Sequence, residues 1–458
     1  MNKRMFYKTL IIILSFVIVA CEKTKEPTVI GPSEVKTDVH LLTVQELDNL
    51  IHPLSGASPE LNHDDMLPLA YLGNSKIVGL GEATHGTKEF FQLKHRIFKY
   101  LVENHGFKIF GFEADMGESI FIDRYITTGK GNIKNLMLNK MHFWTWKTEE
   151  VKDLIEWMKI YNEGKTEDDK IHYMGVDCQY MTYQPYLILE YFNKVKPEFI
   201  SEINPTLNMI KAMRNNVPSR VREYYENMSA TKKQEISDSL GNVLTKINDI
   251  ESELIAKSSH FEYLYIRQLV RNMQQVNEKL FTSTRTEYSY RDKYMAENAI
   301  WLSTLFGENT KIAIWAHNGH VSYDTSYDYD GSMGYHLKSE IGTQYQIVGF
   351  SFSKGSFSAA YRGTRIPRVW EINTDPHKFS LNHIFFKAKY DNFILKIADI
   401  PTHSESGSLI STLADFLSIG AWYDSAIRNP PCQYISLRDC FDVLINYDIT
   451  TAAVQLSY

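Results

Sequence analysis

Residues 76–96 read KIVGLGEATHGTKEFFQLKHR, a strand-like run, a turn and a helical pattern in succession. The apolar run Ile77–Leu80 predicts a short buried strand. A glycine-rich turn with Glu82 and His85 follows, and a helical pattern with apolar residues on one stripe begins at about Thr87. In open α/β sheets, ligands bind beyond the carboxyl ends of the strands. The turn is therefore the first candidate for a functional site.

Three later strand-like runs also lead to carboxylates or imidazoles. These are residues 108–113, 171–177 and 311–316, which lead to Glu113, to Asp177 and to the pair His317 and His320. The carboxyl ends of parallel strands lie on one edge of a sheet. We therefore expect these side chains to converge with Glu82 and His85 in one cleft.

The region 185–290 contains no strand-like run and is dominated by long polar helical patterns. We predict an α/β fold for residues 41–458, with a central, mostly parallel sheet flanked by helices and a large helical insertion at 185–290. Further strands are expected at residues 345–352, 393–397 and 443–447, and loops at residues 367–373 and 402–408.

The composition favours a folded protein with a sizeable core. The chain has 458 residues, of which 43% are hydrophobic and 13% aromatic, so disorder is excluded as its main state. The net charge of -6 is small, and no basic run with interleaved aromatic residues is present. Nucleic acid is therefore not an expected partner.

The N-terminus has the pattern of an export signal. A basic start precedes an apolar run at residues 9–20, which is too short to span a membrane. The run ends at Ala20-Cys21, which resembles the lipobox of bacterial lipoprotein signal peptides. The resemblance implies that residues 1–20 are removed, that Cys21 is lipidated and that residues 21–40 form a flexible tether. The protein would then be a membrane-anchored lipoprotein of the bacterial cell envelope; a plain secretory peptide or a short anchor is the alternative.

Three further cysteines remain, at Cys178, Cys432 and Cys440. An odd number of cysteines in an exported chain implies at least one free thiol or an intermolecular disulfide bond. Cys432 and Cys440 are close enough in sequence to pair, and the sequence leaves that pairing open. No C-x-x-C motif is present, which argues against a thiolate zinc site.

Two familiar site types fit the sequence poorly. The run Gly79–Gly81 follows a strand as in a dinucleotide site, but the third glycine position holds Thr84, and Glu82 would repel a pyrophosphate. A serine hydrolase needs a G-x-S-x-G turn, and the nearest run, GFSFS at 349–353, lacks the final glycine.

The remaining residues favour direct hydrolysis. An imidazole with a pKa near its reference value of ~6.5 can take a proton from water at neutral pH. A neighbouring carboxylate can orient the imidazole and stabilise its charged form, and a second imidazole or an arginine can stabilise an oxyanion. Histidines and carboxylates also suit zinc or manganese, although no H-E-x-x-H helix is present.

Several short motifs together resemble the erythromycin esterase family, over residues 40–458. They are GEATHGT at 81–87, Phe112-Glu113, Arg291-Asp292 ahead of Met295-Ala296, and WAHNGH at 315–320. The resemblance implies an α/β fold with a large helical part. It also implies hydrolysis of a macrolide lactone without a covalent enzyme intermediate, the reaction by which resistance members inactivate the antibiotic.

By this resemblance, His85 is the general base, Glu82 and Glu113 are supporting acids, and His317 and His320 are further active-site imidazoles. Arg291 is added as an oxyanion or carboxylate contact, with a helix-surface ion pair as the alternative. No cofactor and no metal ion are predicted.

The predicted function is metal-independent hydrolysis of a cyclic or bulky ester of the macrolide-lactone type by His-activated water, with a small-molecule ester or lactone as the substrate. The resistance enzymes act inside the cell, whereas this chain is expected to be exported, so the natural substrate need not be a macrolide. Two alternatives stay open: a metal-dependent hydrolase at the same cleft, and a surface lipoprotein that binds a ligand without turnover.

Overall fold

A computed structural model describes residues 43–215, 225–281, 287–323, 331–361, 364, 366–426 and 432–457. The expected signal peptide (1–20), Cys21 and the tether (21–40) lie outside these residues. Among the described helices, none combines the length and the apolar character that a membrane crossing requires. Cys178 and Cys440 are buried, and Cys432 is half-buried.

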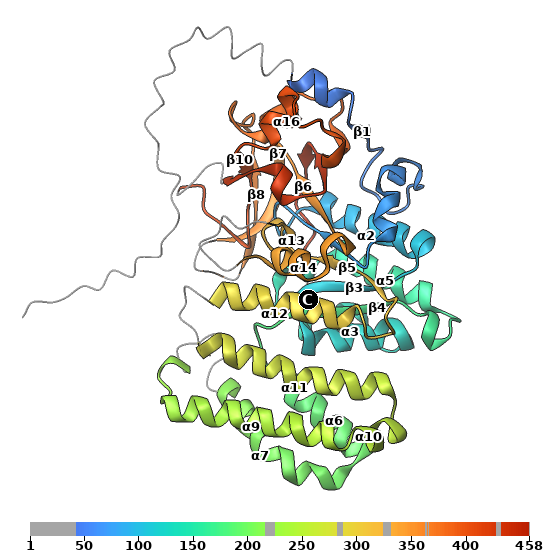
Figure 1. Ribbon diagram of the computed structural model, residues 1–458, viewed down its shortest axis with the longest axis vertical. Coiled ribbons are helices and arrows are strands. Elements are labelled where there is room, and N and C mark those ends of the chain that lie inside the picture. Colours follow the sequence, from blue (N-terminus) through green and yellow to red (C-terminus); the bar gives the residue numbers. More distant parts are fainter. Residues whose placement is uncertain are drawn as a thin grey trace, which may run out of the picture.

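An eight-stranded sheet forms the centre of the molecule, in the order β1-β9-β13-β6-β2-β5-β3-β4 (Figure 1). The six strands from β13 to β4 run parallel, and at one edge β9 pairs antiparallel with both β13 and β1. This confirms the predicted mostly parallel α/β fold. Their bounds are β1 His52–Pro53, β2 Ile77–Leu80, β3 Phe107–Asp115, β4 His172–Asp177, β5 Lys311–Trp315, β6 Tyr345–Ser351, β9 Asn392–Lys396 and β13 Val443–Tyr447.

The register places the expected strand ends next to one another. Leu80, the last residue of β2, is aligned with Trp315 of β5 and with Val348 of β6. Trp315 is aligned in turn with Phe112 of β3. The residues that follow β2 and β5 and those at the end of β3 are therefore neighbours on one edge of the sheet.

The two faces of the sheet bury two separate apolar cores. Successive residues of a strand point to opposite faces, so Ile312 and Ile314 belong to one core while Ala313 and Trp315 belong to the other. The parallel strands are covered on both faces, which explains why they are almost continuously apolar.

Helices α2 (Lys88–His105) and α5 (Glu149–Asn162) cover one face. The α2 helix ends at Gly106, whose φ of 71° is left-handed and favours glycine. The α5 helix begins at Thr148, whose side chain accepts a hydrogen bond from the Val151 N–H. Both ends therefore have residues that are typical of helix caps.

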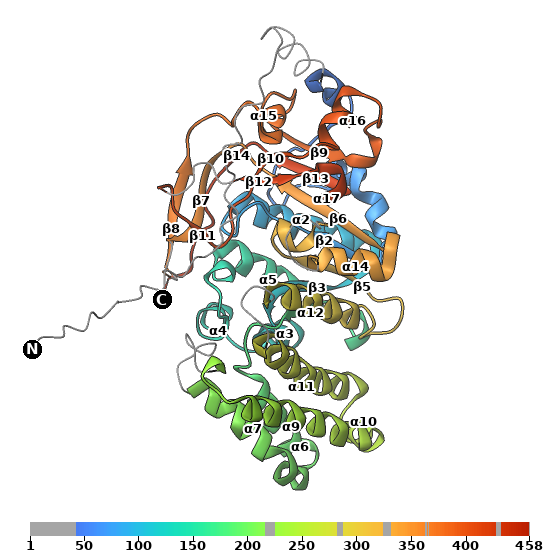
Figure 2. The same cartoon turned by 60° about the vertical axis from the view of Figure 1, so that its left-hand side comes forward.

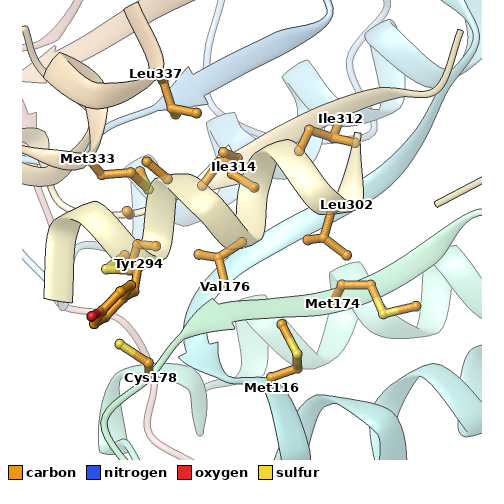
Figure 3. Close-up of a cluster of buried hydrophobic side chains, with 14 of the residues drawn as sticks. Met116, Met174, Val176, Cys178, Tyr294, Leu302, Ile312, Ile314, Met333 and Leu337 are labelled. Carbon is orange, nitrogen blue, oxygen red and sulfur yellow. The ribbon is translucent and has the colours of Figure 1, made fainter. Parts of the chain in front are cut away.

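Helix α12 (Glu287–Leu302) covers the other face, beside α14 (Met333–Ile341). Figure 3 shows side chains of α12, such as Tyr294 and Leu302, in one apolar cluster with Val176 of β4 and with Ile312 and Ile314 of β5. This packing fixes the position of α12 against the sheet.

The helical insertion forms a layer of its own, with α11 between α9 and α12 (Figures 1 and 2). In α9, the buried residues Ile236, Leu240, Val243 and Ile247 recur at helical spacing and face the neighbouring helices. The layer consists of α6 Gln184–Val195, α7 Ile200–Asn215, α9 Ala230–Asp249, α10 Glu251–Lys257 and α11 His260–Phe281.

The C-terminal part contains structure that the sequence pattern did not predict. Residues 367–373 were expected to be a loop, but β8 (Pro367–Ile372) pairs antiparallel with β7 (Lys354–Tyr361). Three of the six residues of β8 are exposed and one is buried, so it lacks the apolar alternation by which strands are recognised. The expected loop at 402–408 is also partly wrong, because α16 (Glu405–Ile410) begins there with Ser404 as its cap.

Candidate active site

The turn after β2 holds Glu82 and His85 in direct contact. Glu82 is fully buried, and its Oε1 accepts a hydrogen bond from Nδ1 of His85 at 2.7 Å. Neutral His85 therefore carries its proton on Nδ1 and a lone pair on Nε2. No residue that the structure describes is hydrogen-bonded to His85 Nε2, and 12% of the side chain is exposed. The geometry leaves Nε2 able to accept a proton.

A buried lysine holds the second oxygen of Glu82. Lys94 of α2 forms an ion pair with Glu82 Oε2, which also accepts a hydrogen bond from Trp315 Nε1 at 2.7 Å. Burial raises the pKa of Glu82, but Lys94 and His85 outweigh it, so this pKa is lowered. Burial lowers the pKa of Lys94 to about 8, and Glu82 opposes that shift. The carboxylate of Glu82 is therefore charged at neutral pH.

The turn itself is fixed by close backbone contacts. The Gly86 carbonyl accepts hydrogen bonds from the Ser358 N–H at 2.8 Å and the Ala453 N–H at 2.9 Å. A Cβ atom at Gly86 would lie 2.1 Å from the Ser358 carbonyl oxygen, so only glycine fits. Asn318 joins the turn to β6, because its N–H donates to the Glu82 carbonyl at 2.9 Å and its Nδ2 donates to the Phe350 carbonyl at 2.8 Å.

Arg291 of α12 is the centre of a second cluster. Its Nε donates to Asp177 Oδ1 at 3.0 Å and its Nη2 to Asp177 Oδ2 at 2.7 Å, which is a bidentate pair. The same Nη2 donates to Glu113 Oε1 at 2.7 Å. All three side chains are buried, so the alternative of a helix-surface ion pair is wrong. The guanidinium contacts carboxylates of the protein itself.

His317 is held on both ring nitrogens. Its Nε2 donates to the Ile419 carbonyl at 3.2 Å, and its Nδ1 accepts from the Gly319 N–H at 3.1 Å. Burial, and then the neighbouring His85, lower the pKa of His317 to about 3, so its ring is neutral. Its ring centroid lies 5.0 Å from that of His85, and its backbone N–H donates to Glu113 Oε2 at 3.1 Å.

His320 has the opposite electrostatic environment. Its Nδ1 lies 2.6 Å from Asp292 Oδ1, and its Nε2 lies 3.3 Å from Glu113 Oε1 and 3.0 Å from Nη1 of Arg291. Burial lowers the pKa of His320, but Asp292 and Glu113 outweigh burial and raise it to about 10. His320 is therefore an imidazolium at neutral pH. His317 and His320, three residues apart, have different charges.

The structure thus brings the six residues predicted for the site together through direct contacts. His317 connects the two clusters, because it contacts both His85 and Glu113. A hollow of about 410 Å³, lined by Lys108 and Lys165 among others, lies instead at the amino-terminal ends of β3 and β4 and contains none of the six.

Three buried residues of the site were not assigned a role from the sequence. Lys94 lies in the apolar stripe of α2, between Phe90 and Phe98, and a charge in such a stripe is a usable signal. Asp177 was expected near the site as a strand-end residue, without a role, and Asp292 was noted only as part of a motif. Asp177 contacts Arg291, which is more than a hundred positions away, and Asp292 contacts His320 on another element. No local sequence pattern indicates such contacts.

The described part of the chain offers no ligand set for the metal-dependent alternative. Across the described residues, no group of three or more His, Cys, Asp or Glu side chains is arranged to hold a metal ion. At the position where Glu113 and Asp177 converge, the guanidinium of Arg291 is their positive partner.

A sequence model of the erythromycin esterase family matches residues 102–450. The match includes Glu113, Arg291, His317 and His320 and begins after the turn that carries His85. An Escherichia coli protein, erythromycin esterase type II, is 26% identical over 321 residues, which cover 66% of this chain and 75% of that protein. A putative hydrolase of Bacillus subtilis, YbfO, is 25% identical over 283 residues, or 58% of this chain and 60% of that protein.

Solved structures share the fold. A Bacillus cereus protein is 26% identical with a TM-score of 0.80, and the alignment covers 91% of this chain and 99% of that chain. A mutant of the erythromycin esterase EreC in its open conformation is 15% identical with a TM-score of 0.64, covering 87% of this chain and 96% of that chain, and it supports the fold alone. The family match spans well over half of the sequence, and the chain belongs to the erythromycin esterase family.

Proposed function

We propose that this protein hydrolyses a cyclic or bulky ester, of the macrolide-lactone type, with water as the nucleophile and His85 as the general base. The observation that carries the proposal is the Glu82–His85 pair. A buried, charged carboxylate holds Nδ1–H, and the lone pair on Nε2 has no partner among the described residues. That is the arrangement of a base that can take a proton from water.

The reaction needs no covalent enzyme intermediate. Water attacks the carbonyl carbon while His85 Nε2 takes one of its protons, and Glu82 stabilises the imidazolium that forms. A positioned general base of this kind contributes about 10²- to 10⁴-fold to the rate. Lys94 and Trp315 keep Glu82 charged and in place, and this explains why a lysine is buried here.

Arg291 and His320 supply fixed positive charge for the negative oxygen of the tetrahedral intermediate. Arg291 and the imidazolium of His320 are held by carboxylates in a largely buried setting, where reorganisation during the reaction is small. His317 is neutral and bonded on both nitrogens, so its role is to position the Glu113 side chain and the wall beside His85.

The substrate class rests on the family. The Escherichia coli relative is an erythromycin esterase, so a macrolide lactone is the first compound to test. The test incubates purified protein with macrolides and a panel of bulky esters and lactones, and reads the gain of one water by mass spectrometry. His85→Gln is the matched control.

Hydrolysis by the wild type that survives chelation and is lost in His85→Gln supports the proposal. Loss of wild-type activity on chelation, with recovery on adding zinc or manganese, would favour the metal-dependent alternative. Tight binding of a panel compound without any gain of water would favour the ligand-binding alternative.

We also propose that the mature protein is anchored to the bacterial cell envelope through lipid on Cys21. The support is the N-terminal sequence, with its basic start, short apolar run and Ala20-Cys21. Cys21→Ala should move the protein from the membrane fraction to another fraction or block its processing. Unchanged membrane fractionation and unchanged mass of the mature chain would contradict the anchor.

A further inference from the structure

The segment 376–390, PHKFSLNHIFFKAKY, combines basic and aromatic residues far from the candidate active site in the sequence. It carries three lysines and two histidines but no acidic residue, although the whole chain has a net charge of -6. Three lysines in fifteen residues are too sparse for the basic run of a nucleic-acid-binding protein. The segment contains the short helix α15 (Leu381–Phe386) and leads into β9.

Each lysine of this segment lies over the aromatic ring next to it in the sequence. The ring centre is 4.9 Å from Nζ in all three pairs, which are Lys378 with Phe379, Lys387 with Phe386, and Lys389 with Tyr390. All three lysines are exposed, and Phe379 is 50% exposed. Aromatic rings and long basic side chains are the groups that proteins place at a membrane–water interface, with the ring at the level of the lipid headgroups and the ammonium in water.

The segment lies beside the start of the described chain. The Lys389 N–H donates to Asp48 Oδ1 at 2.6 Å, and β1 pairs with β9 directly after the segment. Figure 2 shows α15 and the blue start of the described chain at the end of the molecule opposite α7 and α10. Residues 22–42 connect Thr43 to Cys21. A flexible chain of that length spans about 25 Å on average, so lipid on Cys21 would keep this end of the molecule close to a membrane.

We propose that the segment 376–390 is a membrane-contacting face, in which the three lysines bind anionic phospholipid headgroups and Phe379 enters the interfacial layer. The choice of a membrane as the partner rests on the proposed lipid anchor at Cys21. The face adds an orientation to that anchor. It directs α15 toward the lipid surface and the helical layer α6–α11 away from it.

The charges around the face set the strength of the contact. Two exposed acidic residues, Asp375 and Asp391, flank the segment. Asp375 forms an ion pair with Lys354 at 2.9 Å, whereas Asp391 offsets part of the positive charge. The attraction is therefore modest, and it should weaken as salt shortens the Debye length from about 10 Å at 0.1 M to about 3 Å at 1 M. A modest contact of this kind suits a chain that a lipid already holds near the surface.

The test measures how the mature chain, residues 21–458 with Cys21→Ala, partitions onto phospholipid vesicles by co-sedimentation. Vesicles of phosphatidylcholine alone are compared with an equal mixture of phosphatidylcholine and phosphatidylglycerol. The chain should bind the mixed vesicles at least about tenfold more strongly. The triple variant Lys378→Gln/Lys387→Gln/Lys389→Gln should lower that partition coefficient by about 100-fold, since each lysine near an anionic surface contributes about fivefold.

Matched variants elsewhere on the surface control for net charge and for exposed apolar area. Lys194→Gln/Lys246→Gln/Lys257→Gln removes the same charge from surface lysines of the helical layer and should change partitioning by less than about threefold. Phe379→Ser should weaken binding to both kinds of vesicle by about fivefold, because the exposed half of the ring no longer leaves water. Its control is Ile160→Ser, on α5, where the side chain is 61% exposed.

Loss of vesicle binding in the segment's variants alone, with unchanged far-UV spectra, is the expected result. No binding of the mixed vesicles by the unsubstituted chain, or equal losses in the segment's variants and the controls, would overturn the membrane-contacting face. A dimer in solution that the triple variant dissociates, without vesicle binding, would assign the segment to a second copy of the chain and also overturn it. The lipid anchor fails separately, because it is judged by the mass of the mature chain and its fractionation in cells.

Discussion

A substitution of Lys94 is the most informative perturbation of the site, because its positive charge is fully buried and ion-paired with Glu82. Lys94→Met keeps an unbranched apolar chain and removes that charge. Glu82 is then left as a buried carboxylate with hydrogen bonds from His85 and Trp315 and no full positive partner. Breaking a buried ion pair by removing one partner costs about 3–5 kcal/mol.

We therefore expect Lys94→Met to lower the free energy of unfolding by about 3–5 kcal/mol, measured by urea denaturation with far-UV circular dichroism. Glu82 should also take up a proton more readily, so His85 loses its charged partner and hydrolysis falls. The double variant Lys94→Met/Glu82→Gln removes both charges. It should recover most of the stability and none of the activity.

A surface pair provides the matched control. Lys246 forms an ion pair with Glu202 at 3.0 Å, and both side chains are close to half exposed. Lys246→Met should change the free energy of unfolding by less than about 1 kcal/mol, because water replaces the lost contact. If Lys94→Met costs no more than Lys246→Met, or if the double variant is no more stable than Lys94→Met, the reasoning about the buried pair is refuted.

Two further predictions concern the turn and the core. Gly86→Ala should lower the free energy of unfolding by about 1–3 kcal/mol and reduce hydrolysis, because its Cβ would lie 2.1 Å from the Ser358 carbonyl oxygen. Gly241→Ala is the control and should be neutral or stabilising, because the nearest atom is 4.0 Å from its Cβ. Equal shifts of the melting temperature in both variants would contradict this. His95 is buried with no hydrogen bond to Nε2, and burial lowers its pKa to about 3. A folded-state pKa below the unfolded value of ~6.5 means that stability is lost as the pH falls. Between about pH 8 and about pH 5, the free energy of unfolding of His95→Phe should therefore rise by about 2 kcal/mol relative to that of the wild type. The same difference between the urea midpoints of variant and wild type at both pH values would contradict this.

The local signals in the sequence predicted the parts of the fold that depend on local physics. The apolar run Ile77–Leu80 forms β2, and a helix follows the glycine-rich turn at Thr87, both as expected. Such features depend on a few neighbouring residues, and the period of a strand or helix is visible in the sequence itself.

Features that depend on distant partners were not visible. The strands β2 and β3 are consecutive in the chain, yet β5 lies between them in the sheet. The partly exposed strand β8 pairs with β7, and the order of apolar and polar residues in β8 does not indicate that pairing. Pairing across long loops is a property of the whole chain.

The candidate site shows the same division. His85 and Glu82 are three residues apart, and their contact follows from one turn. The electrostatic difference between His317 and His320 could not be predicted, because it depends on Asp292 and Glu113 from other elements and on burial. Residue types at strand ends therefore indicated which side chains lie together in the candidate site, and the charge of each group depends on the assembled structure.

The most direct measurement of the central claim is the turnover number of wild type and His85→Gln on one hydrolysed ester, with Glu82→Gln alongside. Our account predicts a loss of about 100-fold or more in His85→Gln, with the far-UV spectrum unchanged, because the general base is gone. A His85→Gln enzyme that hydrolyses the ester within about tenfold of the wild-type rate would contradict the account.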